Sequence, residues 1–327
     1  MKILGVETSC DETAVAIVEN GTKVISSSLA SSLPLHAKSG GIIPEIAARE
    51  QTKTIIPVVT EVLGEPPSKQ IDAIAVTFGP GLHGSLIVGV EVAKTLSYVW
   101  KKPLIPVSHL ISHIYATWIE NTTPPKFPLI ALIVSGGHTE LVYMQGHGNY
   151  KSLGGTRDDA AGESLDKIAR LLRLGYPGGP AIEKAAIQGD SQKFNLPRPL
   201  LNSPDYDFSF SGLKTAVTSL VSNIGEENLS DNINNIAASV QAAVVEVLIT
   251  KAKKASASLP AESIVFGGGV AANKLLREEA GKSLSIPVFF PPINLSVDNG
   301  VMVAAAAYFN YKIVPWSKLE PDPSILL

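Results

Sequence analysis

Two histidines one helical turn apart are the first residues whose types and spacing could do chemistry. His109 and His113 lie in "SHLISHIYATW", and residues four apart project from the same face of a helix. Such a pair offers two nitrogen ligands to a metal ion, although the bare pattern also fits two exposed histidines. The apolar residues of the segment fall on the opposite side, which predicts that the pair points away from the packed face. Leu110 stands where the motif H-E-x-x-H of zinc proteases has its glutamate, so the motif lacks a general base.

A single carboxylate late in the chain is a candidate third ligand. Asp298 precedes a long apolar segment in "NLSVDNGVMVAAAA". It could simply be an acidic residue in the first turn of a helix, where the helix dipole favours negative charge. If it meets His109 and His113, the three form a 2-His-1-carboxylate site with open positions, which suits Fe²⁺ or Zn²⁺.

Three glycine turns are candidates for close approach of a nucleotide to the backbone. They are Ser135-Gly136-Gly137-His138-Thr139, Gly178-Gly179 and Gly267-Gly268-Gly269. The last follows a predicted strand and precedes a predicted helix, so its N–H groups could meet phosphate or ribose oxygens. None is a Walker A loop or a G-x-G-x-x-G fingerprint, and each alone is also explained as an ordinary turn.

Acidic residues gather in two further places. Asp159, Glu163 and Asp166 in "TRDDAAGESLDKIA" share one face of a predicted helix, where they repel one another unless a cation or ligand hydroxyls lie between them. They could equally be stabilising charges at a helix start. The opening "ILGVETSCDETAVAIVE" places Cys10, Asp11 and Glu12 between two apolar runs. A lone cysteine without a local base is weak support for a nucleophile.

Composition restricts the class of protein. The chain has 327 residues, enough for two lobes, with a net charge of −3 and a pI of about 6.1. Because no basic excess exists, contacts to a polynucleotide would need a local patch or a partner. The single cysteine excludes an internal disulfide and fits a reducing cytosol. A carboxylate, Glu7, comes too early for a signal peptide, and no apolar run approaches the roughly 20 residues of a membrane span. These features predict a cytoplasmic protein that does not associate with membranes.

Strands and helices alternate in two halves that each begin with a hairpin. Strands are expected over 2–6, 13–19, 23–29, 71–77, 104–107 and 129–134, and helices over 44–63, 86–100, 109–120 and 297–309. Asn20-Gly21 is a strong signal for a hairpin turn. The segment "LIALIVSGGHTELVYMQ" repeats the opening pattern weakly, which suggests two related lobes. The pattern predicts an α/β protein with mixed sheets and a cleft between lobes.

The expected domains follow from this repeat. The N-terminal lobe covers 1–107 and is completed by the C-terminal helix and tail, about 297–327. The C-terminal lobe covers 108–296 and contains a mainly helical insertion, about 158–258.

Taken together and in order, these pieces resemble the bacterial TsaD family. The resemblance rests on "GVETSCDET", "GGIIPEIAAREQ", "GPGLHGSLIVG", "SHLISH", "LIVSGGHTEL", "DDAAGESLDK", "YPGGP", "SFSGLKT", "FGGGVAANKLLRE" and "VDNGVMVA", and it spans essentially the whole chain. It implies transfer of threonylcarbamoyl from L-threonylcarbamoyl-adenylate to N6 of adenosine 37 in tRNAs that read ANN codons, with release of AMP. It also implies an actin-like ATPase (ASKHA) fold of two lobes built from duplicated RNase H-like sheets.

The resemblance further implies site residues and partners. His109, His113 and Asp298 would hold one ion, Fe²⁺ or Zn²⁺. The adenylate would contact Val134, Ser135, Gly136, Gly137, His138, Asp166, Gly179 and Asn273, and Glu183 would reach the ribose. Expected partners are tRNA, a TsaB-like paralogue and a TsaE-like ATPase, with the donor made by a TsaC-type synthase. Gln51 departs from the pattern, because members commonly have histidine there.

The opening stretch then has a hypothetical role. In this fold its tip faces the nucleotide phosphates, so Thr8 and Ser9 could donate hydrogen bonds. Asp11 or Glu12 could orient N6 or accept its proton, and Glu12 is the preferred residue. Three rival readings remain: an ATP-dependent small-molecule kinase of the same fold, a metalloprotease, and a TsaB-like scaffold. The protease lacks its motif, and a scaffold would lack the metal-ligand set.

Overall fold

The chain folds into two compact units. The structure is a computed structural model that describes residues 1–37, 40–64 and 71–325. The first unit comprises Met1–Pro124 and Pro291–Leu327, and the second comprises Pro125–Phe290. The boundary expected after residue 107 therefore lies after Pro124, because the helix that begins at His109 packs on the helix that begins at Gly300 and stays with the first unit.

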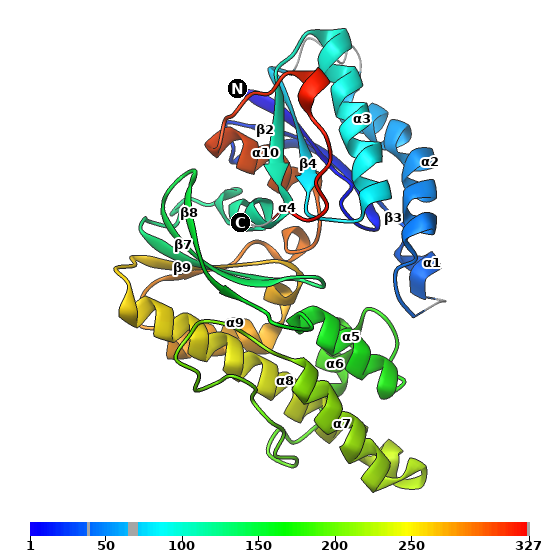
Figure 1. Cartoon of the computed structure of the whole chain (residues 1–327), viewed down its shortest axis with the longest axis vertical. Coiled ribbons are helices and arrows are strands. Elements are labelled where there is room, and N and C mark those ends of the chain that lie inside the picture. The colour runs from blue at the N-terminus through cyan, green and yellow to red at the C-terminus, as the bar shows by residue number, and fades with distance from the viewer. Residues whose placement is uncertain (38–39, 65–70, 326–327) are drawn as a thin grey trace. The chain divides into compact units, whose positions relative to one another are not determined.

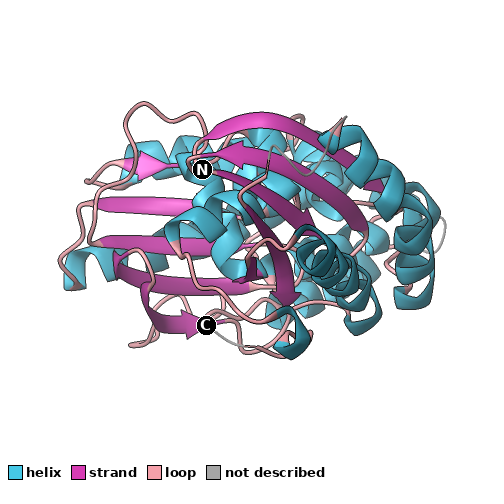
Figure 2. Ribbon diagram, turned by 90° about the horizontal axis from the view of Figure 1, so that it is seen from above, coloured by secondary structure: helices cyan, strands magenta, loops and turns pink. Residues whose placement is uncertain are grey.

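The first unit is built on a five-stranded mixed sheet with the order β3-β2-β1-β4-β5. Figure 1 labels β2, β3 and β4 of this sheet, and Figure 2 shows the strands of the chain in magenta. Strands β1, β2 and β3 are antiparallel neighbours, whereas β4 and β5 join parallel to β1. Their bounds are β1 Lys2–Glu7, β2 Glu12–Glu19, β3 Lys23–Ser31, β4 Ala73–Gly79 and β5 Leu104–Ser108. Asn20 and Gly21 form the expected hairpin turn, both with positive φ, as a type I′ turn requires.

Helices cover both faces of this sheet. Leu4 and Val6 of β1 point into a core formed with α2 (Pro44–Leu63) and α3 (His83–Trp100). Gly5 lies between them and faces the other side, since side chains alternate along a strand. There α10 (Gly300–Phe309) comes so close that a Cβ on Gly5 would lie 2.6 Å from the backbone nitrogen of Ala304. The unit also contains α1 Leu33–Ala37 and α4 His109–Tyr115, with 3₁₀ turns at Ala116–Trp118, Ile293–Leu295 and Trp316–Lys318.

The second unit repeats the sheet of the first. Its strand order is β10-β9-β6-β7-β8, with β6, β7 and β8 antiparallel and β9 and β10 parallel to β6. The bounds are β6 Leu129–Val134, β7 Thr139–Gly146, β8 Asn149–Gly155, β9 Ser263–Gly267 and β10 Val288–Phe289. Read from β8 to β10, this is the order and the direction pattern of β3 to β5. The structure confirms the predicted duplication and adds β8, which the sequence pattern did not show.

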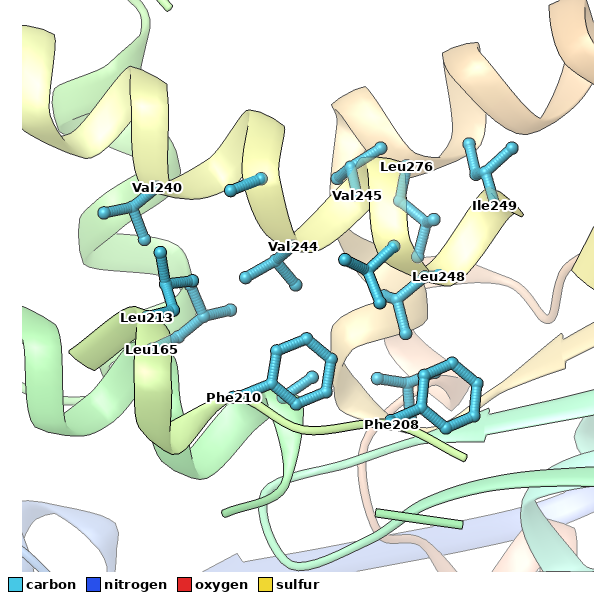
Figure 3. Packing of buried hydrophobic residues seen from close by; sticks show 14 of the residues in the cluster. Leu165, Phe208, Phe210, Leu213, Val240, Val244, Val245, Leu248, Ile249 and Leu276 are labelled. Atoms are coloured by element: carbon cyan, nitrogen blue, oxygen red, sulfur yellow. The ribbon is translucent and has the colours of Figure 1, made fainter. Parts of the chain in front are cut away.

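The core of the second unit lies between its sheet and a layer of helices. Phe208, Phe210 and Leu213 pack against Val244 and Leu248, which lie on α8 (Glu226–Ser258) (Figure 3). The helices are α5 Ala161–Leu171, α6 Gly178–Ala186, α7 Ser211–Ile224, α8 Glu226–Ser258 and α9 Lys274–Ser283, with a 3₁₀ turn at Gly269–Ala272.

Helix α8 is long and apolar enough to cross a membrane, judged by its length and composition alone. Within the described residues it is the one helix that passes this test, although Gln241 and Glu246 interrupt its apolar residues. Of its most apolar 18-residue stretch, 67% is buried inside the protein. Its side chains form the core seen in Figure 3, which accounts for the composition.

Candidate functional site

Three side chains from distant parts of the sequence meet within the first unit. His109, His113 and Asp298 each present one ligand atom, and these atoms lie within 4.8 Å of one another. The Oδ1 atom of Asp298 is 3.3 Å from Nε2 of His113 and 3.6 Å from Nε2 of His109. The two imidazole rings meet edge to face with centroids 4.7 Å apart. In the described part of the chain, this is the one group of three such residues placed to hold a metal ion.

Two helix starts position the three ligands. Strand β5 ends at Ser108 and α4 begins at His109, so His109 and His113 project one turn apart as the spacing predicts. Asp298 lies before α10, whose cap is Asn299: its side-chain oxygen accepts from the Met302 N–H, and its amide donates to the carbonyls of Leu295 and Val297. The expected helix 297–309 thus begins at Gly300. Asp298 is held on the capped turn rather than in the first helical turn.

The alternative of two exposed histidines is wrong. His109 retains 6% of its accessible surface and His113 retains 1%. The expected helix 109–120 is a short α-helix followed by a 3₁₀ turn, and every residue of α4 is buried. Helix α4 packs on β5, β4 and α10, so the face opposite its apolar stripe is covered as well.

A second layer of polar groups orients His109. Its Nδ1 atom lies 3.2 Å from Oε2 of Glu7 and 3.1 Å from Oγ of Ser9. Glu7 is fully buried and also accepts from the hydroxyl of Thr77 at 2.6 Å and from the Ser9 N–H at 2.6 Å. A carboxylate at Nδ1 fixes the imidazole with Nε2 toward Asp298, the usual arrangement around a metal-binding histidine. This role of Glu7 was not predicted from the sequence. The feature that could have indicated it is a carboxylate at the end of an otherwise apolar strand.

The donor set fits a divalent transition metal. Among the residues that the structure describes, neither ring nitrogen of the buried His113 has a hydrogen-bond partner, an arrangement that normally costs about 1–3 kcal/mol per group. Coordination of Nε2 would satisfy one of them. Two imidazole nitrogens and one carboxylate oxygen are ligands that Zn²⁺ and Fe²⁺ accept, with positions left open for another ligand.

The charges around the site also favour a cation. Burial opposes the imidazolium of His109, but the charges of Asp298 and Glu7 outweigh it and raise the pKa to about 9. Burial and the nearby carboxylates of Asp298 and Asp11 raise the pKa of Glu12 to about 10. Both shifts reflect crowded negative charge in a poorly solvated place, which a bound cation would offset.

The same crowding argues against Cys10 as a nucleophile. Burial, followed by the charges of Asp11, Asp298 and Glu12, raises the pKa of its thiol well above the usual value. Because the thiolate is the reactive form, this surrounding suppresses it.

The opening loop differs from its expected role at two residues. The Thr8 side chain is fully buried against Gly89, and its hydroxyl finds no hydrogen-bond partner within the described part of the chain. The hydroxyl of Ser9 lies against His109. These positions do not support direct donation to phosphate by Thr8 and Ser9. Asp11 and Glu12 belong to the same unit as the metal-ligand set, and the charge of Asp298 acts on the carboxyl of Glu12.

The glycine turns of the second unit separate into two kinds. A Cβ on Gly162, Gly178 or Gly268 would strike backbone of Ser135, Asp166 or Val134, so packing requires these glycines. Gly136, Gly137, Gly179 and Gly269 face open space and do not have positive φ. At these positions the backbone is open to close approach by a ligand.

The expected adenylate contacts gather at one edge of the second sheet, where β6 and β9 end. Ser135 and His138 close the β6–β7 turn, with the Ser135 N–H donating to the His138 carbonyl at 2.9 Å. The Ser135 carbonyl accepts from the Gly162 N–H at the start of α5. Asp166 accepts from the Gly178 N–H at 2.6 Å, and burial raises its pKa despite this bond and a further one from Gly179. Val134, Ser135, Gly136, Gly137, His138, Asp166 and Gly179 therefore belong to one connected set of turns. In open α/β sheets, the carboxyl ends of strands are where ligands bind.

Asn273 and Glu183 hold the start of α9. The Oδ1 atom of Asn273 accepts from the Leu276 N–H at 3.0 Å and from Nε2 of Gln241 at 3.1 Å. These donors fix the amide orientation, so Nδ2 is directed away from the two donors that bind Oδ1. Glu183 accepts from the Lys274 N–H at 2.8 Å, so this carboxylate oxygen already has a structural partner. The contact of Gln241 with Asn273 was not predicted from the sequence, because Gln241 lies in the middle of an apolar helix.

Two of the three clustered carboxylates, Asp159 and Glu163, form ion pairs with Lys167. Asp159 precedes α5 rather than lying on it, and Lys167 bonds Asp159 at 2.6 Å and Glu163 at 2.9 Å. The repulsion that suggested a ligand is therefore relieved inside the chain. Asp166, the third carboxylate, instead accepts a hydrogen bond from the Gly178 N–H of a glycine turn.

Comparison with known proteins gives consistent matches. The family model described as "TsaD: tRNA N6-adenosine threonylcarbamoyltransferase" matches residues 23–305. Proteins named tRNA N6-adenosine threonylcarbamoyltransferase from Thermomicrobium roseum and Moorella thermoacetica are 50% and 49% identical; each alignment covers 94% of this chain and 92% of the relative. The protein of that name from Bacillus cereus is 46% identical over 95% of this chain and 91% of the relative.

Solved structures share the fold at low identity. Component A of (R)-2-hydroxyglutaryl-CoA dehydratase from Acidaminococcus fermentans has a TM-score of 0.57 and 15% identity, over 94% of this chain and 98% of that chain. HypF from T. kodakarensis has a TM-score of 0.61 and 16% identity, over 94% of this chain and 47% of that chain. These neighbours confirm the actin-like ATPase fold.

Proposed function

Because the chain belongs to the TsaD family of tRNA N6-adenosine threonylcarbamoyltransferases, we propose that it transfers threonylcarbamoyl from L-threonylcarbamoyl-adenylate to N6 of adenosine 37 in tRNAs that read ANN codons. The observation that carries the proposal is the convergence of His109, His113 and Asp298 in a buried, negatively charged site of a chain with this family match. An inactive scaffold of the same fold would not need to retain this ligand set.

The proposed reaction exchanges one bond for another at the carbamoyl carbon. The N6 nitrogen of adenine attacks that carbon, the bond from the carbon to the phosphate oxygen breaks, and AMP leaves with the electron pair. The N6 nitrogen loses one proton. Because its lone pair is delocalised into the ring, this amine is a weak nucleophile, so the enzyme must stabilise the developing oxyanion and accept the proton.

We assign one resident ion, Fe²⁺ or Zn²⁺, to His109, His113 and Asp298, with Glu7 behind His109. When bound, such an ion supplies a Lewis acid for oxygens of the donor. Glu7 and Ser9 hold the His109 ring at Nδ1, so Nε2 is directed toward Asp298 and would be available as a ligand. The backbone N–H groups of Gly136 and Gly137 and of the Gly267–Gly269 turn are candidates to stabilise negative charge on the donor, whereas the Ser135 N–H already donates to the His138 carbonyl.

The residues of the second unit would bind the donor nucleotide. Val134, Ser135, Gly136, Gly137, His138, Asp166, Gly179 and Asn273 are the proposed contacts, and four observations support them: open space beside three glycines, the partly buried Asp166 carboxylate at the Gly178 turn, the oriented Asn273 amide and their common sheet edge. Glu183 is a weaker candidate for the ribose, since one of its oxygens already accepts from Lys274.

Glu12 is the proposed proton acceptor, with Asp11 beside it. A carboxyl with a pKa of about 10 is protonated at neutral pH and cannot accept a proton. The proposal therefore requires that positive charge bound at Asp298 lowers the pKa of Glu12 during the reaction. Asp11 would hold the carboxyl of Glu12 in place.

Partners would complete the system in the cytoplasm. The net charge of −3 supports a tRNA surface shared with other chains, which we propose are a TsaB-like paralogue and a TsaE-like ATPase. A TsaC-type synthase would supply the donor. Adenosine 37 lies in an anticodon loop, so the base can be splayed out without opening a duplex.

Mass analysis of tRNA nucleosides tests the proposal. The wild-type chain, incubated with preformed donor, partners and tRNA, should convert adenosine to N6-threonylcarbamoyladenosine. The variant His109→Ala should lose most of this product. A matched control is His83→Ala, since His83 is an exposed histidine of the same unit. Equal product from His109→Ala and wild type would contradict the proposal. The kinase alternative is not favoured, because the family match and the named relatives are all transferases.

A further inference from the structure

We propose that Gln51 is a positioning residue, which holds the Thr8–Glu12 loop so that Ser9 and Glu12 keep their places at the metal-ligand set. The inference rests on the proposed function, because it concerns the same ion site. Gln51 lies on α2 and retains 1% of its accessible surface.

The side-chain amide of Gln51 reaches three backbone carbonyls of one short loop. Its Nε2 atom lies 3.0 Å from the carbonyl oxygen of Cys10, 3.0 Å from that of Glu12 and 3.3 Å from that of Thr8. An NH₂ group has two hydrogens, so one of them is shared between two acceptors. Because carbonyl oxygens only accept, the nitrogen and not the oxygen of the amide must face the loop.

The other end of the same amide has no hydrogen bond. Oε1 of Gln51 is buried without a hydrogen-bond partner among the described residues. A buried acceptor without a donor is destabilising, so the placement of this amide is not explained by its own hydrogen-bond balance. The three bonds to the loop are the evident gain.

The loop that Gln51 holds leads directly to the ion site. Ser9 lies between two of the held carbonyls, and its hydroxyl is 3.1 Å from Nδ1 of His109. Glu12 carries the third held carbonyl, and its side chain is the proposed proton acceptor of this site. A shift of the loop would therefore disturb the orientation of His109 and the place of Glu12 together.

Neighbouring donors hold the remaining carbonyls of the loop. The Ser9 carbonyl accepts from the Leu82 N–H at 2.8 Å, and the Asp11 carbonyl accepts from Ser32 through its N–H at 3.1 Å and its hydroxyl at 2.9 Å. Ser85 adds a second donor to Cys10 at 3.0 Å. All five carbonyls from Thr8 to Glu12 thus accept donors from other segments, and the amide of Gln51 serves three of them.

Cobalt binding tests this inference without tRNA or donor. We use Co²⁺ as the probe because its visible absorption reports both affinity and ligand geometry. The variant Gln51→Met keeps an unbranched side chain and removes both N–H donors. It should bind Co²⁺ about tenfold or more weakly, as changes behind metal ligands do, with a changed visible spectrum. Gln51→His restores one donor and should lie between Gln51→Met and wild type.

Thr54→Val is the matched control. Thr54 lies one turn further along α2 and donates to the hydroxyl of Thr13 at 3.0 Å, not to the loop. This variant should keep wild-type Co²⁺ affinity and spectrum. A folded Gln51→Met with wild-type affinity and spectrum would overturn the inference. If Gln51→Met does not fold, Gln51→His decides by the same criterion. Unchanged Co²⁺ binding by His109→Ala would instead contradict the assigned ion site.

Discussion

At the scale of the residue, the fitness of the site for a metal ion depends on the burial of the two histidines and on the polar groups that orient His109. His109 and His113 fit a metal pair because both are buried, and His109 is fixed at Nδ1 by Glu7 and Ser9. The spacing of the histidines predicts their common face. It does not predict their burial, because the apolar stripe of α4 accounts for only one side of a helix that is covered on every side.

Removal of the charge on Glu7 should weaken the ion site. Glu7→Gln keeps the size of the side chain but replaces the carboxylate that faces Nδ1 of His109. Metal affinity should fall by about 10- to 100-fold, measured by competition with a Zn²⁺ indicator. Glu19→Gln, at the far end of the β2 strand, is the control and should not change affinity. Equal affinity for Glu7→Gln and wild type would remove Glu7 from the account.

Glu12 can be tested separately from metal binding. Glu12→Ala, supplied with preformed adenylate, should slow single-turnover transfer by about 10²- to 10⁴-fold, the usual contribution of a general base. Rapid-quench measurement of the nucleoside product gives the rate. An unchanged rate would exclude Glu12 as the proton acceptor.

At the scale of the element, close backbone approaches bring the ligands together. Helix α10 crosses the sheet so closely that a Cβ on Gly300 would lie 2.6 Å from the backbone nitrogen of Ala16. This contact places the capped turn that carries Asp298 beside α4. The apolar sequence of α10 predicts a buried helix, but the glycine contact that sets its position is visible only in the structure.

Gly300→Ala should therefore cost both stability and metal affinity. The added methyl group meets backbone atoms of β2 that cannot rotate away, and overpacking of this kind costs about 1–3 kcal/mol. Chemical denaturation measures the first effect and Zn²⁺ titration the second. Gly281→Ala is the control, because a Cβ there meets nothing within 4 Å; it should be neutral or stabilising. A Gly300→Ala chain as stable as wild type would contradict the packing account.

A pH effect is expected where β7 meets the loop before α7. Burial, followed by the charge of Asp207, raises the pKa of Glu140 to about 7. The folded chain thus binds a proton there that the unfolded chain, with an ordinary glutamate pKa, has lost. Stability from this group is full below the unfolded pKa and falls as pH rises through about 7.

Glu140→Gln isolates this effect. Since the group is only partly buried, we expect a modest shift. Relative to wild type, the variant should gain in unfolding midpoint between pH 5 and pH 8. A difference between the two chains that stays constant across this range would contradict the raised pKa. Arg157, which pairs with Asp207 at 2.7 Å, must be left unchanged in both.

At the scale of the whole molecule, the sequence predicts more about architecture than about contacts. The repeated hairpin segments predict two related lobes, and both sheets have the same strand order and directions. Strand β8 was not predicted, because "NYKSLGG" lacks the alternation of β-branched or other apolar residues with polar ones that is typical of a strand. The first unit extends to Pro124 because α4 packs against α10, a contact between residues nearly 200 positions apart, and no local pattern records such a pairing.

In the candidate site, too, some residues could be predicted from the sequence and others are recognised only from their contacts in the structure. His109, His113 and Asp298 were identified from residue type, spacing and resemblance, and the structure brings them together. Glu7, Gln51 and Gln241 act through contacts with chain segments distant in sequence. Their types alone carry no signal, since a buried polar residue in an apolar element has many explanations.

The most direct test of the central claim is single-turnover transfer to tRNA by the metal-depleted chain. The product, N6-threonylcarbamoyladenosine, is measured by nucleoside mass analysis with partners and preformed donor present. We predict that chelation abolishes the product and that Zn²⁺ or Fe²⁺ restores it in wild type but not in His113→Ala. Full transfer by rigorously metal-free wild-type chain would contradict the account.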